Sequence, residues 1–283
     1  MTTHHDYPRI TFHDVEQRTD EWHALRRGIL TASTLGRLIT RTPVPLTEYP
    51  CRDCGAEPYN PCVSKAKTKG EPAPIKTVHR SRESIAAEVG ATTLTVADND
   101  IARGLIATLA GERITGHVED GPFTRDMERG VMAEPFAEDA YVERTGNTVE
   151  HVGFIVRHFD GFALGMSPDG LVGEDGLTEW KAPRARGHIS TVLADEVPAH
   201  HVAQCQTALL VTGRKWIDFV SFHGGLPLYI KRVHPDPQWF AAIEAAARAA
   251  EAAIVDITER YESATAGLPA TDRMPDPYAE MVV

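Results

Sequence analysis

The sequence predicts an α/β (α+β) fold in which a central mixed sheet is flanked by helices and one small segment is inserted near the start. Three observations support this prediction. Strand-like runs joined by turn residues occupy the middle of the chain. Apolar residues at helix spacing precede and follow these runs. A stretch rich in Pro, Gly and Lys, with little apolar content, separates the first helices from the rest.

The composition is that of a soluble globular protein. Of 283 residues, 42% are hydrophobic and 24% are charged, enough for one large or two modest domains. No apolar run approaches the roughly 18 residues of a membrane span, and residues 1–8 lack the apolar core of a secretion signal. We therefore expect a cytoplasmic protein. The net charge of −11 argues against nucleic-acid binding by the whole surface, but a basic groove on an acidic body remains compatible with it.

The N-terminal segment is predicted to hold two short helices around a turn. Thr19 or Asp20 can cap the first helix, which carries Arg26, and Gly28 ends it. The residues Thr31-Ala32-Ser33 open the second helix. Hydroxyls at a helix N-terminus beside an arginine suit a phosphate, although simple helix capping accounts for the same spacing.

The inserted segment, residues 46–83, has the spacing of a metal site. Cys51 and Cys54 form a C-x2-C pair, Cys62 follows after seven residues and His79 after sixteen more. Three cysteines and one histidine suit a closed tetrahedral zinc site, and a segment with so few apolar residues needs such a staple to fold. Free thiols in a loop are the alternative.

Basic residues gather in two places despite the acidic total. In the inserted segment they are Lys65, Lys67, Lys69, Lys76, Arg80 and Arg82, against Glu71 alone. The second cluster is Lys181, Arg184 and Arg186. We expect the first cluster to bind DNA or a partner, because local positive charge attracts phosphate whatever the net charge.

The middle of the chain is predicted to be helical. Residues 83–110 show helix spacing with a break at 90–99, and residues 111–121 are predicted as a loop. Residues 125–144 form a strongly amphipathic helix that carries Glu134 directly before a proline. Proline removes a backbone donor and would kink the helix. Helical phase alone leaves Glu134 an ordinary exposed acid.

The predicted sheet follows this helix as a mostly antiparallel meander. Its strands are 148–157, 162–166, 171–172 and 177–181, with a hairpin signal at Asp160-Gly161. After it, residues 199–212 read as a helix with Cys205 on its apolar stripe, residues 215–222 and 228–233 as closing strands, and residues 238–257 as a closing helix.

One stretch of the meander carries chemistry. Asp169 lies in Ser167-Pro168-Asp169-Gly170, and Glu179-Trp180-Lys181 follows ten residues later. Because side chains on a strand alternate, Glu179 and Lys181 share a face that Trp180 does not. Two carboxylates suit Mg²⁺ or Mn²⁺, and a neighbouring lysine can orient a water and offset negative charge. Taken alone, the same pattern also fits a surface hairpin with solvated charges.

These residues form the P-D-x(9)-E-x-K core of the PD-(D/E)XK nucleases. Together with Q-R-T-D-E-W-H-A-L-R-R-G-I-L-T-A-S near the start, G-x-x-x-E ending at Glu134, and H-V-A-Q-C-Q around Gln204, the chain resembles the YqaJ-like viral recombinase family, which includes the phage lambda exonuclease. The patches occur in the family's order over about residues 16–256. His201 stands where the family has Tyr, and the inserted segment is a departure from the lambda-type pattern.

The resemblance implies roles for individual residues. Asp169, Glu179 and the Trp180 carbonyl would hold a metal ion, with Glu134 completing the shell of a second Mg²⁺. Lys181 would orient the attacking hydroxide. Two further roles are implied: Gln204 would help hold Lys181, and Arg26 and Ser33 would contact DNA phosphate.

The same resemblance implies a function. Such a protein would degrade one strand of linear duplex DNA from the 5′ end, using two Mg²⁺ (or Mn²⁺) ions, and would act at double-stranded DNA ends in phage-type recombination. Its partner would be a single-strand annealing protein, it would assemble as a trimer, and it would act in the host cell cytoplasm. The inserted segment resembles small zinc fingers of phage proteins.

Two other functions fit the sequence. The chain could be an endonuclease or a single-strand-specific nuclease of the same superfamily, or a non-catalytic, zinc-dependent DNA-binding or adaptor protein. The predicted domain division is 1–45 for the N-terminal part of the nuclease domain, 46–83 for the finger, 84–260 for the nuclease core and 261–283 for a flexible acidic tail.

Overall fold

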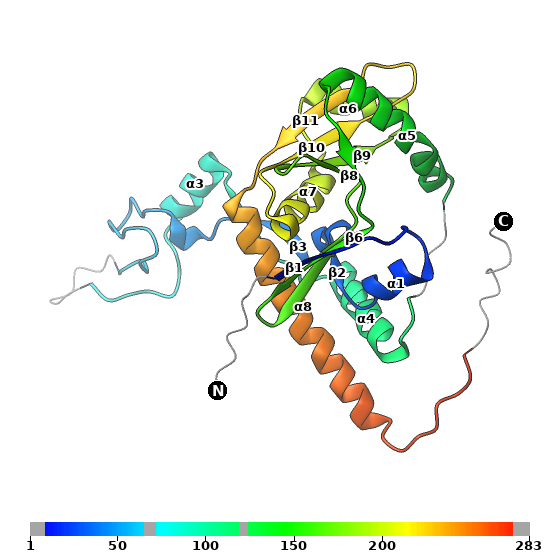
Figure 1. The fold of residues 1–283 in the computed structure, drawn as a ribbon. Coiled ribbons are helices and arrows are strands. Elements are labelled where there is room, and N and C mark those ends of the chain that lie inside the picture. Colours follow the sequence, from blue (N-terminus) through cyan, green and yellow to red (C-terminus); the bar gives the residue numbers. More distant parts are fainter. Residues whose placement is uncertain (1–8, 65–71, 119–123, 274–283) are drawn as a thin grey trace, which may run out of the picture.

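The computed structural model describes residues 9–64, 72–118 and 124–273 (Figure 1). The predicted basic residues Lys65, Lys67 and Lys69 and the last part of the predicted acidic tail lie outside these residues. Within them, no helix is both long and apolar enough to cross a membrane.

The strands form two main sheets and one ribbon. The first sheet has the order β1-β6-β7-β2 and contains β1 (Arg9–His13), β2 (Leu30–Thr31), β6 (Phe154–Phe159) and β7 (Phe162–Met166). The second has the order β11-β10-β9-β8-β5 and contains β5 (Val149–Glu150), β8 (Gly170–Val172), β9 (Gly176–Lys181), β10 (Trp216–Ser221) and β11 (Tyr229–Val233). Both sheets are mixed, because β2 runs parallel to β7 and β10 parallel to β9.

The mixed α/β class is thus confirmed, but the expectation of one continuous meander is wrong. The strand-like runs after residue 148 divide between the two sheets: β6 and β7 pair with each other and with β1, whereas β8 and β9 pair with β10. Such pairing joins residues far apart in the chain, and a local pattern of alternating residues does not specify its partner.

Helices cover the sheets. They are α1 (Asp20–Arg26), α2 (Ala32–Leu35), α4 (Asp100–Thr115), α5 (Arg125–Thr145), α6 (Ala185–Ala194), α7 (Ala199–Thr212) and α8 (Pro237–Ala264), with the 3-10 turn η1 (Gly36–Leu38) after α2. Thr19 caps α1 by accepting from the Trp22 N–H, as predicted. Helix α7, which is buried from Cys205 to Thr212, packs against α2, α8, β6 and β10, and Cys205 lies in this core.

Two helices extend beyond their predicted bounds. Helix α4 continues to Thr115, into the expected loop, and ends where Gly116 adopts a left-handed φ of 65°. Helix α8 continues to Ala264, into the expected tail. Helix α5 runs through Pro135 without interruption. Helix α6 was not predicted. Its apolar residues Ile189, Val192 and Leu193 lie at helix spacing, but all three are exposed.

The inserted segment is mounted on a two-stranded ribbon. Strand β3 (Ile39–Pro43) pairs antiparallel with β4 (Thr92–Val96), from Ile39 opposite Val96 to Pro43 opposite Thr92. Between them lie η2 (Leu46–Glu48), the cysteines and α3 (Arg80–Val89). Figure 1 shows this segment projecting away from the body of the molecule. Strand β4 occupies the predicted break at 90–99. The domain division itself stays a prediction.

Candidate active site

The predicted carboxylates meet where two strands lie side by side. Strand β8 pairs antiparallel with β9, with Gly170 opposite Thr178, so Asp169 falls level with Glu179. The Trp180 N–H donates a hydrogen bond of 2.6 Å to Asp169 Oδ2. Glu179 is only 2% exposed, and its carboxylate contacts the Lys181 ammonium. The structure therefore brings Asp169, Glu179 and Lys181 together.

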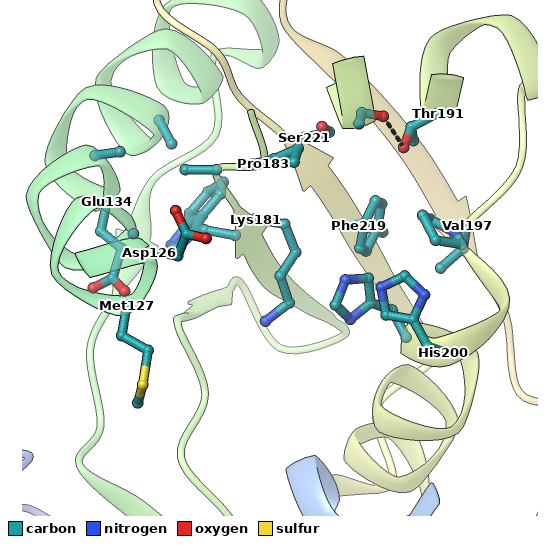
Figure 2. A pocket seen from close by; sticks show the side chains of 18 of the residues that line it. Asp126, Met127, Glu134, Lys181, Pro183, Thr191, Val197, His200, Phe219 and Ser221 are labelled. Atoms are coloured by element: carbon teal, nitrogen blue, oxygen red, sulfur yellow. Dashed lines mark hydrogen bonds between the residues drawn. The ribbon is translucent and has the colours of Figure 1, made fainter. Parts of the chain in front are cut away.

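The strand alternation predicted from the sequence is confirmed. Lys181 points into a large cavity (Figure 2). Trp180 packs in a separate apolar cluster, where its ring makes an edge-on contact with Tyr141 at 5.2 Å between centroids. Tyr141 donates to Asp218 (2.8 Å), which accepts two more bonds from Arg232. This network ties α5 to β10 and β11.

Gln204 lies at the same centre but has a different partner from the one expected. Its amide donates a 2.6 Å hydrogen bond to Glu179 Oε1, whereas we expected it to hold Lys181. The bond comes from α7, and the Lys181 ammonium contacts the same oxygen, so Glu179 Oε1 has two partners. Two partners leave a buried carboxylate with little freedom to turn.

The cavity beside these residues has a volume of about 2110 Å³. Helices α5 and α6 and the first turn of α7 form its walls, and Glu134 on α5 faces it together with Lys181 (Figure 2). The structure therefore places Glu134 on the wall of the same cavity, although its side chain remains exposed.

The charges of the site act on one another. Burial raises the pKa of Asp169 well above its usual range, and the charge of Glu179 adds to this effect. Partial loss of water likewise raises the pKa of Glu134, against the opposing charges of Arg18 and Lys181. Burial disfavours the Lys181 ammonium, but Glu179 and Asp169 outweigh it and raise the pKa of Lys181. Three acids around one ammonium leave surplus negative charge, which a divalent cation would neutralise.

His201 faces this cavity as a neutral ring. Burial, followed by the charge of Lys181, lowers the pKa of His201 to about 3. Its ring lies 5.5 Å from that of Phe219 and 4.0 Å from that of His200, between centroids. At physiological pH His201 is therefore an uncharged aromatic side chain, at the position where the family that the sequence resembles has Tyr.

The residues of the N-terminal motif lie next to the carboxylate site, but most of them do not line its cavity. The Trp22 indole donates to Ser167 Oγ at 2.8 Å. The Arg26 guanidinium stacks on the Trp22 ring at 4.1 Å, and burial lowers its pKa. Ser33 is exposed in the first turn of α2, where its hydroxyl meets that of Thr31 at 3.2 Å. Of these five side chains only Trp22 lines the cavity.

The second candidate site is the cysteine cluster. One ligand atom from each of Cys51, Cys54, Cys62 and His79 lies within 4.8 Å of all the others. Cys51 Sγ lies 3.4 Å from His79 Nδ1. All four cysteines of the chain are free of disulfides. Three sulfurs and one imidazole at this separation fit a tetrahedral zinc ion, so the predicted ligand set converges.

One predicted DNA-binding cation has a different place. Arg82 is fully buried, and its guanidinium donates to four backbone carbonyls of the loop before it. The acceptors are Leu46 (3.5 Å), Thr47 (3.0 Å), Glu57 (3.2 Å) and Asn60 (2.7 Å). The expectation that Arg82 belongs to an exposed basic cluster is wrong, because these carbonyls need a buried donor. Lys76 and Arg80 are exposed.

Sequence reasoning missed Arg18. This residue lines the cavity in a left-handed backbone conformation, with φ of 72°. Its position in Q-R-T carried no signal beyond membership of the N-terminal motif, because φ is set by the contacts of its neighbours.

Fold and site together define a class of protein. Two carboxylates and a lysine at paired strand ends of a mixed sheet, with helices on its faces, resemble the core of the PD-(D/E)XK nucleases. Residues 86–215 match the YqaJ-like viral recombinase domain, and residues 15–99 match a "Putative DNA-binding phage zinc finger domain". The resemblance found in the sequence is thereby confirmed.

Solved structures agree with these matches. An alkaline exonuclease from Laribacter hongkongensis is 28% identical, with a TM-score of 0.61, over 89% of this chain and 100% of that one. The same enzyme in complex with dAMP matches equally well. No curated protein matches the chain in sequence. The comparisons support a nuclease of the exonuclease type, a divalent metal at its centre, zinc at the cysteine cluster and DNA as partner.

Proposed function

We propose that this protein is a divalent-metal-dependent exonuclease that degrades one strand of linear duplex DNA from the 5′ end in phage-type recombination. The observation that carries the proposal is the meeting of Asp169, Glu179 and Lys181 beside a cavity of about 2110 Å³. The recombinase-domain match and the similarity to an alkaline exonuclease support it.

The donor set fits Mg²⁺ or Mn²⁺. Asp169, Glu179 and Glu134 offer carboxylate oxygens, and the surplus negative charge among them is what a hard cation offsets. We assign Asp169, Glu179 and the Trp180 carbonyl to one ion and Glu134 to a second. When bound, such ions supply a water of lowered pKa and stabilise charge on the phosphoryl oxygens.

The protein's own residues position the reactants. The Trp180 N–H holds Asp169, and Gln204 holds Glu179, so neither carboxylate needs to reorient during the reaction. Lys181 reaches into the cavity, where its ammonium can orient a water toward the scissile phosphate and offset the charge that develops there. Arg26 and Ser33 are assigned to DNA phosphates on the resemblance alone.

Partners follow from the same proposal. A nuclease that exposes a single strand needs a protein that protects and anneals it, so we assign a single-strand annealing protein as partner. We also propose a homotrimer, on the resemblance to the recombinase family. Light scattering of the purified protein gives its mass, and a monomer would overturn the trimer without affecting the catalytic assignment.

The deciding experiment compares two DNA substrates with Mg²⁺. One is a 5′-phosphorylated linear duplex and the other a closed circle of the same sequence. We expect loss of the linear DNA alone, with mononucleotides released from the 5′ end. Cutting of the circle would indicate an endonuclease at the same centre. No cutting of either DNA would favour a DNA-binding or adaptor role.

A further inference from the structure

Arg18 is held in a conformation that arginine rarely adopts. Its φ of 72° brings the Cβ close to the backbone, so a non-glycine residue stays there only where its surroundings require it. Hydrogen bonds hold the residues on both sides of Arg18. Gln17 donates a weak bond of 3.4 Å to the Pro168 carbonyl, and Thr19 Oγ1 donates to the Glu16 carbonyl at 2.7 Å.

These contacts tie Arg18 to the catalytic strands. Pro168 directly precedes Asp169, and the Trp22 bond to Ser167 adds a second link one turn further along. The turn that contains Arg18 is therefore fixed to the loop that carries the first predicted metal ligand. Strain held by such contacts at the edge of an active centre is typical of a residue with a functional task.

The Arg18 side chain faces the cavity. Among the described residues that line this cavity, Arg18 and Lys181 are the only arginine or lysine. Lys181 contacts the buried Glu179, and the Arg18 residue is exposed. The acids that line the same cavity are Asp126, Glu134 and Glu196. A DNA strand that enters a cavity lined by these acids needs a cationic side chain to bind its phosphates, and a guanidinium is suited to this.

Arg18 also lies near the second carboxylate site. Its charge is the largest influence that lowers the pKa of Glu134, against the effect of burial. Arg26 occupies a different place, stacked on Trp22 and outside the cavity lining.

We infer that Arg18 binds a backbone phosphate of the DNA strand inside the cavity, next to Glu134. The inference rests on the proposed function, because it takes the cavity as the path of that strand. The strained turn sets the guanidinium in place before the DNA arrives, so little side-chain freedom is lost on binding.

Three variants test this inference. Arg18→Gly removes the charge and relieves the strain, because glycine accepts a positive φ; Arg18→Lys keeps a charge without the planar fork. Arg260→Ala removes an exposed arginine from the far part of α8 and serves as the control. For each we would measure the melting temperature, KM and kcat with Mg²⁺, and binding of fluorescent DNA over a salt series without added divalent metal.

For Arg18→Gly we expect an unchanged or higher melting temperature and a KM for DNA raised by about tenfold or more, the loss of one charge-assisted contact. The slope of log affinity against log salt should fall by about 0.7 to 0.9, the value for one phosphate. Arg18→Lys should recover part of the affinity and the whole slope. Arg260→Ala should match the wild type.

Other results would overturn the inference. A wild-type KM and slope for Arg18→Gly would do so while leaving the exonuclease assignment intact. A lower kcat with unchanged KM and slope would instead place the effect of Arg18 on Glu134. If the wild type cuts no DNA, the proposed function fails, but the salt series still decides whether Arg18 contacts phosphate. If the wild type binds no DNA, both the proposed function and the role of Arg18 are contradicted.

Discussion

The two candidate metal sites are built in opposite ways. Asp169 and Glu179 are positioned by paired strands, a buried helix and hydrogen bonds from Trp180 and Gln204. The cysteine cluster lies in a segment with little apolar content, where the described support is the buried Arg82 guanidinium and the carbonyls it holds. At the first site the fold arranges the ligands for chemistry. At the second the metal itself contributes to folding.

The largest effect should come from the catalytic lysine. We expect Lys181→Ala to reduce cleavage of linear duplex DNA by about a thousandfold or more, because it removes a preorganised charge from the centre. DNA binding should remain within a few fold. Lys215→Ala, at an exposed lysine paired with Asp175, is the control and should cleave normally. Retained turnover of Lys181→Ala with Mg²⁺ would contradict the assignment.

Zinc removal should separate the two sites. We expect a zinc-selective chelator to unfold the cysteine segment, detected as rapid proteolysis between residues 44 and 91, while the sheets keep their melting transition. The ribbon of β3 and β4 isolates the segment from the core. If the core lost its transition together with zinc, the two sites would form one cooperative unit.

Arg82→Ala should have an intermediate effect within the same segment. It removes the donor of the Asn60 carbonyl, whereas the carbonyls of Leu46, Thr47 and Glu57 each keep a backbone N–H. An unsatisfied group costs about 1–3 kcal/mol. We expect weaker zinc retention in a competition assay with a chromogenic chelator. Arg80→Ala, at the exposed neighbour two residues earlier, should retain zinc as the wild type does. Equal zinc retention by both variants would mean that zinc alone holds the loop.

The smallest effect should come from Gln204. We expect Gln204→Leu to keep a side chain of similar size but to remove one of the two partners of Glu179 Oε1. This should lower kcat by about tenfold and raise the Mg²⁺ concentration needed for half-maximal rate. Its melting temperature should stay close to that of the wild type. A lower melting temperature with unchanged Mg²⁺ dependence would make Gln204 a packing residue only.

The reactive centre could be predicted because its information is local. Asp169, Glu179 and Lys181 lie within one hairpin, and strand alternation fixes which side chains share a face. The cysteine cluster was equally accessible, since ligand type and spacing carry the signal. Arg82 was not accessible. In sequence it is one more basic residue of a charged stretch, and only the folded loop shows the four carbonyls that it serves.

The rest of the fold depended on distant partners. Strand β4 was predicted as a break because its partner β3 lies on the far side of the inserted segment. The division into two sheets was missed for the same reason, as β1 and β10 pair with strands remote in the chain. The strained φ of Arg18 likewise follows from contacts with residues 16 and 168.

The ribbon of β3 and β4 has a consequence for how such a chain can diversify. Pro43 and Thr92 lie opposite each other as the last pair of the ladder, so the inserted segment leaves and re-enters the body at neighbouring points. Any module whose own ends meet could be exchanged there without moving a catalytic residue. The end of the β3–β4 ribbon is thus an insertion point, where one scaffold could acquire, lose or replace a recognition module while its chemistry stays the same.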